Sequence, residues 1–143
     1  MDLIPFNLPY IPTGTHEAMM TSLSSGKLSG DGPETAAASS LLSKLFNDSP
    51  VLLTPSCTHA LELAIRLIGA GPGDEVIVPS YTFTSTANAV VLAGATPVFV
   101  DIEPETLNID VDEIRTAITS KTKAVFWPAM VTGMSLLDTL QLL

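Results

Sequence analysis

The stretch GDEVIVPSYTFTSTANAVVLAGATPVFVD, residues 73–101, contains the pattern that decides the fold of this chain. Its apolar run at residues 75–78 is stopped by a proline and predicts a short, buried strand. Residues 85–93 predict a helix that ends at a glycine, and Thr96–Val100 predicts a second strand. A strand, a helix and a second strand joined by short connections are typical of a βαβ unit with parallel strands.

The same alternation of strand and helix continues on both sides of this unit. Upstream, residues 51–54 predict a strand and residues 57–69 predict an amphipathic helix. Downstream, Asp110 predicts the N-cap of a further helix, and residues 123–127 predict a fourth strand. The inward-facing residues of these two helices are predicted to be Leu61, Ala64, Ile65, Ile68, Ile114 and Ile118. We therefore expect an α/β fold, in which helices flank a parallel-rich sheet.

The first fifty residues carry no strand pattern. Residues 1–14 hold three prolines and predict an extended arm. Residues 15–23 predict a short helix, and residues 33–46 predict a second helix that begins with a proline. We expect residues 1–143 to form one partial domain without a second domain, in which residues 1–31 are the arm, the short helix and a loop.

The composition of the chain disfavours several classes of partner. Its 143 residues are 46% hydrophobic and 15% charged, and the formal net charge is -9. Binding to nucleic acid or to an anionic membrane surface needs clustered basic residues, and those of this chain are scattered. The N-terminal stretch lacks the pattern of a signal peptide, and Cys57 is the single cysteine, so no internal disulfide can form. These features predict a soluble, cytoplasmic protein.

Small polar residues follow the first predicted strand, in the stretch TPSCT at residues 54–58. Ligands of open α/β sheets bind at the carboxyl ends of strands, and the first amides of a helix have no intrahelical partner. Ser56, Cys57 and Thr58 would offer such amides, with two hydroxyls, to an anion such as phosphate. Ordinary helix capping explains the same residues, and their position alone favours capping over an anion site. A catalytic pair of Cys57 with His59 is disfavoured, because residues two apart on a helix do not face each other.

Aromatic and acidic residues follow the next two predicted strands. Phe83, in the stretch PSYTF at residues 79–83, could stack on a flat ligand or pack in the core, and the residues alone favour the core. Asp101 ends the strand Thr96–Val100 and is either a ligand contact or a loop cap.

Four stretches together resemble the DegT/DnrJ/EryC1/StrS family of sugar aminotransferases. They are GKLSGDGP, LLTPSCTHALELA, GDEVIVPSYTFTSTANAVVLAGATPVFVDIEPETLNID and AITSKTKAV, within a resemblance that runs from Ile4 to about Val125. The resemblance implies the N-terminal part of the large domain of fold-type I enzymes, which use pyridoxal 5'-phosphate. It also implies amino transfer, usually from glutamate, to a nucleotide-linked 4-keto-6-deoxy sugar in surface polysaccharide synthesis, by a homodimer.

The resemblance assigns roles to four residues. It implies that the amides of Cys57 and Thr58, with the Thr58 hydroxyl, hold the phosphate of the cofactor, and that Ser56 shapes this turn. Phe83 matches the aromatic residue of the family that stacks on the pyridine ring. No residue of this chain matches a catalytic residue of the family, and we predict no metal ligand.

The chain also departs from the family pattern. In the family, the lysine that binds the cofactor covalently and the aspartate that pairs with the pyridine nitrogen lie further downstream, and these 143 residues include neither. In the final stretch, Met130 and Val131 stand where the family has a histidine and an aromatic residue. We therefore expect the chain alone to be inactive, as a fragment or as an interaction module that pairs with a full-length relative. The tail also has leucines at helical spacing, which predict an amphipathic helix: Leu136, Leu137, Leu140 and Leu143.

Overall fold

The computed structural model describes residues 4, 5 and 7–127, which fall into two compact units, Met1–Leu53 and Thr54–Leu143. The predicted leucine helix of the tail lies outside the described residues. Among the helices that are described, none combines the length and the apolar character that crossing a bilayer requires. The assignment of all 143 residues to one partial domain stays a prediction.

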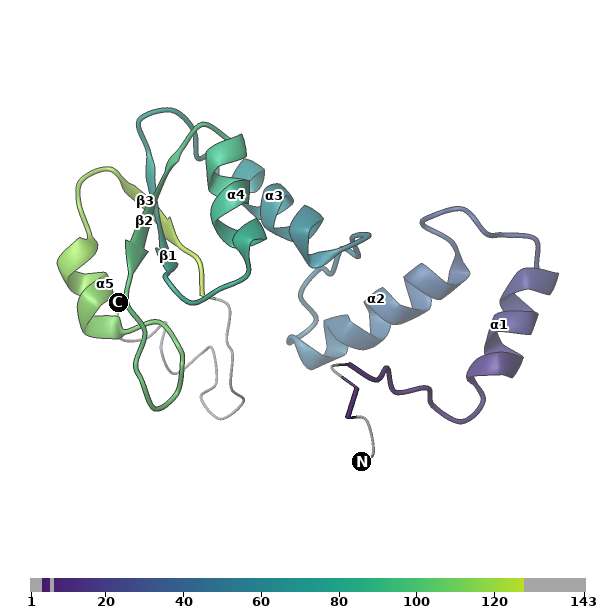
Figure 1. Cartoon of the computed structure of the whole chain (residues 1–143). Coiled ribbons are helices and arrows are strands. Elements are labelled where there is room, and N and C mark those ends of the chain that lie inside the picture. The colour runs from purple at the N-terminus through teal and green to yellow at the C-terminus, as the bar shows by residue number, and fades with distance from the viewer. Residues whose placement is uncertain (1–3, 6, 128–143) are drawn as a thin grey trace. The chain divides into compact units, whose positions relative to one another are not determined.

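The first unit contains two helices, α1 (Thr15–Ser24) and α2 (Pro33–Leu45), as Figure 1 shows. Both were expected from the sequence, and α2 begins with its proline at the first helical position, where a missing amide proton costs nothing. Neither of these described helices has a buried residue. The apolar stripe of α2, which includes Leu41 and Leu45, is therefore exposed within this unit.

The second unit is built on a parallel sheet with strand order β2-β1-β3. The described strands are β1 (Glu75–Pro79), β2 (Thr96–Val100) and β3 (Thr122–Val125), and both pairings of β1 are parallel. Val76, Ile77 and Val78 in the central strand are fully buried. Since successive side chains of a strand point to opposite faces, this apolar run supplies both faces of the sheet at once.

Helices cover both faces of this sheet, with α3 (Cys57–Leu67) and α4 (Thr84–Leu92) on one side and α5 (Val111–Ala117) on the other (Figure 1). The core accordingly has two clusters. On the first face Val76 and Val78 pack with residues of α3 and α4, namely Ile65, Ala89 and Val90. On the second face Ile77 packs with Ile114 of α5. The predicted α/β fold class is confirmed by this arrangement.

Three sequence-based expectations are wrong between residues 51 and 118. Residues 51–54 form no strand in the described structure, and Leu52 in that run is 76% exposed. The physical reason is that both edges of β1 are already paired with β2 and β3, and a four-residue apolar run carries too little periodicity to specify a strand. Ile118 does not face inward, because α5 ends at Ala117 and the backbone is extended at residue 118. Ile68 does not face inward either, because α3 ends at Leu67 and Ile68, which follows it, is 40% exposed.

Candidate functional site

A cavity of about 590 Å³ lies where β1 and β3 end and where α3 and α4 begin. Its walls come from three places in the sequence. Ser56, Cys57 and Thr58 belong to the start of α3, Phe83 to the start of α4, and Trp127 to the segment after β3. The structure therefore brings all four residues predicted to bind the cofactor to one cavity.

The start of α3 is fixed by its N-cap, Ser56. The Ser56 hydroxyl oxygen accepts a hydrogen bond from the amide of His59, at 3.3 Å, and the Thr54 hydroxyl donates to the Ser56 carbonyl, at 2.9 Å. Among the described residues, the amides of Cys57 and Thr58 have no hydrogen-bond partner, as the helix geometry dictates. The capping interpretation of Ser56 is confirmed, and it leaves the next two amides available to an anion.

The start of α4 presents Phe83 to the cavity. Phe83 occupies the N-cap position with an extended backbone, and its side chain is 77% exposed. Packing in the core, which the residues alone favoured, is therefore wrong for this side chain. A hydrogen bond between Thr82 and Thr86, whose hydroxyl oxygens are 2.9 Å apart, stabilises the loop that carries Phe83. Both threonines also line the cavity.

Asp101 is a loop cap and does not line the cavity. One of its carboxylate oxygens, Oδ1, accepts hydrogen bonds from the Ser80 hydroxyl, at 3.2 Å, and from the amide of Ile102, at 2.8 Å. Because Ser80 directly follows β1 and Asp101 directly follows β2, this contact ties together the carboxyl ends of two neighbouring strands. The ligand-contact alternative for Asp101 thus has no support in the described geometry.

Among the described residues that line the cavity, none is charged. An anion bound there would be held by helix amides, hydroxyls and the positive end of the α3 dipole. Lys121 and Lys123 lie at the start of β3, where the Lys121 carbonyl accepts from the amide of Glu75. That is the opposite end of the sheet, roughly 13 Å away along a five-residue strand.

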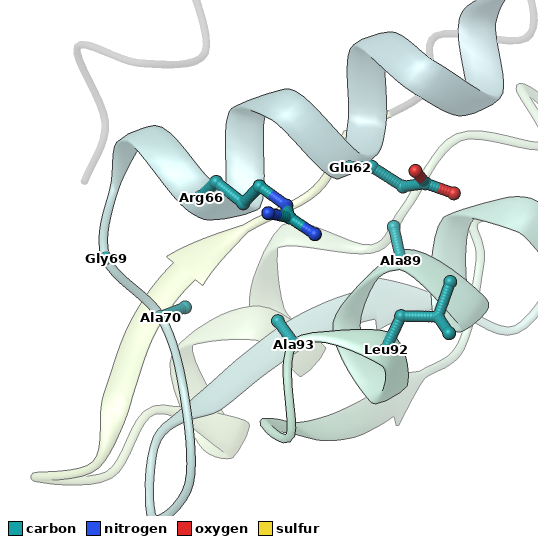
Figure 2. A pocket seen from close by; sticks show the side chains of 7 residues that line it. All are labelled: Glu62, Arg66, Gly69, Ala70, Ala89, Leu92 and Ala93. Atoms are coloured by element: carbon teal, nitrogen blue, oxygen red, sulfur yellow. The ribbon is translucent and has the colours of Figure 1, made fainter.

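A second cavity, of about 600 Å³, opens between the carboxyl-terminal halves of α3 and α4. Figure 2 shows Glu62 and Arg66 projecting from α3 above a floor of small side chains, which includes Ala89 of α4 and Ala93, the residue that follows this helix. Both polar side chains among the described residues of this cavity, Glu62 and Arg66, come from α3, and no sequence pattern predicts the cavity. It lies apart from the first cavity, with which it shares no lining residue.

Sequence reasoning missed Thr86 in the wall of the first cavity and His59 as a contact of Ser56 beside it. The sequence analysis considered His59 only as a partner of Cys57, yet its Nδ1 atom lies 2.8 Å from the Ser56 hydroxyl oxygen. The signal that could have found it is the spacing, because residues three apart on a helix are neighbours.

Comparisons with known proteins agree with the family resemblance of the sequence. Residues 10–142 match the sequence model of the DegT/DnrJ/EryC1/StrS aminotransferase family, so the match extends beyond Val125, where the resemblance was drawn to end. SpsC of Bacillus subtilis (strain 168), a spore coat polysaccharide biosynthesis protein, is 42% identical over 122 residues, which are 85% of this chain and 31% of SpsC.

Solved structures of aminotransferases share the fold. Spr1654 of Streptococcus pneumoniae, assigned by name as a sugar aminotransferase, is 37% identical in its PMP form, with a TM-score of 0.81 over 97% of this chain and 35% of that protein. The aminotransferase TlmJ of Streptoalloteichus hindustanus is 35% identical, with a TM-score of 0.80 over 86% of this chain and 34% of TlmJ. The chain thus spans about a third of the length of these relatives.

Proposed function

The chain belongs to the DegT/DnrJ/EryC1/StrS aminotransferase family, and from this premise we propose that its second unit binds pyridoxal 5'-phosphate in the first cavity, at the N-terminal ends of α3 and α4. One observation carries the proposal. Phe83 and the polar turn at Ser56 are more than twenty residues apart in the sequence, yet both line this single cavity. A volume of about 590 Å³ falls within the usual range for small-molecule sites.

The chemistry of the lining residues fits the proposed cofactor. A phosphate monoester needs hydrogen-bond donors, and the free amides of Cys57 and Thr58, with the Thr58 hydroxyl, supply them at a helix N-terminus. A pyridine ring needs a flat apolar surface, and the exposed ring of Phe83 supplies one. Ser56 acts on the phosphate end through the cap that sets the direction of these amides.

When bound, pyridoxal phosphate supplies the electron sink that amino transfer requires. The residues of this chain bind and orient it, and nothing in the described cavity provides the covalent attachment. Lys121 and Lys123 lie at the far end of the sheet, and the two other lysines, Lys27 and Lys44, belong to the first unit. The reacting lysine of an active enzyme must therefore come from outside the described cavity.

For the whole protein, we propose amino transfer from glutamate to a nucleotide-linked 4-keto-6-deoxy sugar in surface polysaccharide synthesis. The similarity to SpsC, a polysaccharide biosynthesis protein, and to a sugar aminotransferase supports this substrate class. As a second candidate, the chain is an inactive fragment or a module that pairs with a full-length relative. The exposed ring of Phe99 on the edge strand β2 favours such pairing.

The binding proposal is tested with the purified chain and pyridoxal phosphate, by following the absorbance and fluorescence of the cofactor. We expect reversible, stoichiometric binding that Thr58→Val weakens about tenfold, the value of one hydrogen bond to a charged group. Thr116→Val on α5, whose hydroxyl donates to the Asp112 carbonyl on the far face of the sheet, is the matched control. Equal affinities of the two variants would contradict the assignment of Thr58.

Borohydride reduction of the same mixture tests covalent attachment. We expect scattered labelling or none, because no lysine lines the described cavity. A single stoichiometric adduct on one of the four lysines would show that this chain carries its own reacting lysine, and would exclude the inactive-fragment alternative.

A further inference from the structure

We propose that His59 is a positioning residue that controls whether the Ser56 hydroxyl donates its proton to the phosphate in the cavity. The inference rests on the proposed function, because the phosphate is that of pyridoxal phosphate. It is carried by a hydrogen-bonded pair at the edge of the cavity that neither helix capping nor the family resemblance accounts for.

The pair has two contacts on one oxygen atom. The Ser56 hydroxyl oxygen lies 2.8 Å from His59 Nδ1 and accepts from the His59 amide at 3.3 Å. Ser56 lines the cavity, whereas His59 lies one helical turn away with its side chain exposed to solvent. The imidazole therefore acts on the cavity through the serine hydroxyl.

A serine hydroxyl has one proton and two acceptor lone pairs, and the His59 amide occupies one of these lone pairs. When His59 Nδ1 has no proton, it can only accept, so Ser56 donates its single proton to the imidazole. When Nδ1 carries a proton, the imidazole donates to the second lone pair of Ser56. The hydroxyl proton is then free for an oxygen of the phosphate.

Anion binding and protonation of Nδ1 are therefore linked. Protonation of the imidazole releases the serine proton to the phosphate and adds a positive charge nearby, so both effects strengthen binding as the pH falls. By reciprocity, a bound phosphate must favour the protonated imidazole.

The surroundings of His59 contain few competing charges. The titratable and charged groups on α3 are Cys57, Glu62 and Arg66. The helix that packs against α3 is α4, and its sequence, TSTANAVVL, contains no ionisable side chain. The pH dependence of phosphate binding through this pair is therefore assigned to His59, and a variant that replaces only this residue isolates it.

The first test compares the dissociation constant of pyridoxal phosphate for the unaltered chain and for His59→Gln at pH 8 and pH 6. Titration of the phosphate itself is common to both proteins and cancels in the ratio of their dissociation constants. We expect the ratio, variant over unaltered chain, to rise about three- to tenfold from pH 8 to pH 6, as for one partly exposed hydrogen bond to a charged group. His16→Gln, at the other histidine of the chain, on α1, is the matched control and keeps a flat ratio.

The second test separates a role through Ser56 from a direct effect of charge. In the Ser56→Ala background, His59→Gln is expected to give a clearly smaller rise in the ratio, because the hydroxyl that relays the effect is gone and only the direct effect of the charge remains. A ratio that rises as steeply as it does with Ser56 in place would overturn the positioning role. In the ligand-free chain, the imidazole ¹⁵N shifts of neutral His59 report its tautomer, and Ser56→Ala is expected to change the tautomer ratio. An unchanged ratio would also overturn it.

The failure of this inference and of the proposed function are distinguishable. Pyridoxal phosphate that binds the unaltered chain with the same variant ratio at both pH values overturns the inference alone. No binding of pyridoxal phosphate at any pH overturns the proposed function, and the phosphate role of His59 falls with it.

Discussion

The hydroxyl oxygens of Thr82 and Thr86 lie 2.9 Å apart and bridge the turn that carries Phe83. Thr86 is 3% exposed, and its amide donates to the Phe83 carbonyl at 3.0 Å. The Phe83 ring that lines the cavity is therefore exposed, whereas the backbone turn that carries it is held by hydrogen bonds to the buried residue Thr86. This relationship explains how an exposed aromatic side chain can form part of a defined site.

Replacing Thr86 with valine removes the hydroxyl and keeps the shape of the side chain. We expect a loss of about 1 kcal/mol in the free energy of unfolding, because Thr82 loses its partner at a part-buried position. We also expect weaker binding of pyridoxal phosphate, since the turn under Phe83 loosens. Urea unfolding and cofactor titration measure the two effects, and Thr86→Ser, which retains the hydroxyl, should restore the affinity. If the serine variant binds as weakly as the valine variant, the hydroxyl pair does not hold the turn.

Phe83 itself is predicted to matter for binding and not for stability. Phe83→Leu should weaken pyridoxal phosphate binding about two- to tenfold, the value of one aromatic stacking contact. Its effect on unfolding should stay below about 0.5 kcal/mol, because the ring is exposed. Phe99→Leu replaces another exposed phenylalanine of the same unit, on β2, and serves as the control. Equal affinities of the two variants for pyridoxal phosphate would mean that Phe83 does not contact the cofactor.

The βαβ unit at the centre of the second unit could be predicted from the sequence because several signals agree there. The strand β1 is an apolar run that ends at a proline, and α4 is followed by Gly94, whose backbone adopts the left-handed conformation at φ +82° that glycine favours. Residues 51–54 have an apolar run without such agreement. Whether these residues form a strand depends on whether one edge of β1 is unpaired, and no local sequence pattern gives that information.

The candidate site could be predicted in part. The turn at Ser56 and the aromatic Phe83 were found because each directly follows an apolar run, yet their meeting at one cavity depends on the order of strands in the sheet. The contact of His59 with Ser56 was missed, because sequence spacing compared His59 only with Cys57. Thr86 was missed because a threonine inside a helix pattern carries no sign of the residue that it contacts.

The N-cap of α5 offers a test of capping against surface charge. Oδ1 of Asp110 accepts from the amides of Asp112, at 2.8 Å, and Glu113, at 3.4 Å. Asp110→Ala should therefore lower the free energy of unfolding by about 1 kcal/mol. Asp112→Ala removes a carboxylate two residues away that forms an exposed ion pair with Arg115, and it should cost less than about 0.5 kcal/mol. Urea unfolding of both variants decides the matter, and a larger loss for Asp112→Ala would contradict the cap.

Two isoleucines four residues apart at the second core cluster are expected to differ in their contribution to stability. Ile114 on α5 is fully buried and packs in the cluster of Ile77, whereas Ile118, just after the helix, is 49% exposed. Ile114→Ala should cost about 2–5 kcal/mol in the free energy of unfolding, from lost burial and from the cavity that it leaves. Ile118→Ala should cost less than about 1 kcal/mol, because much of its side chain already contacts water. Thermal and urea unfolding of the two variants would compare them directly. Similar losses for both would mean that the backbone does not leave the helix at residue 118, and that the inward orientation expected from the sequence is right after all.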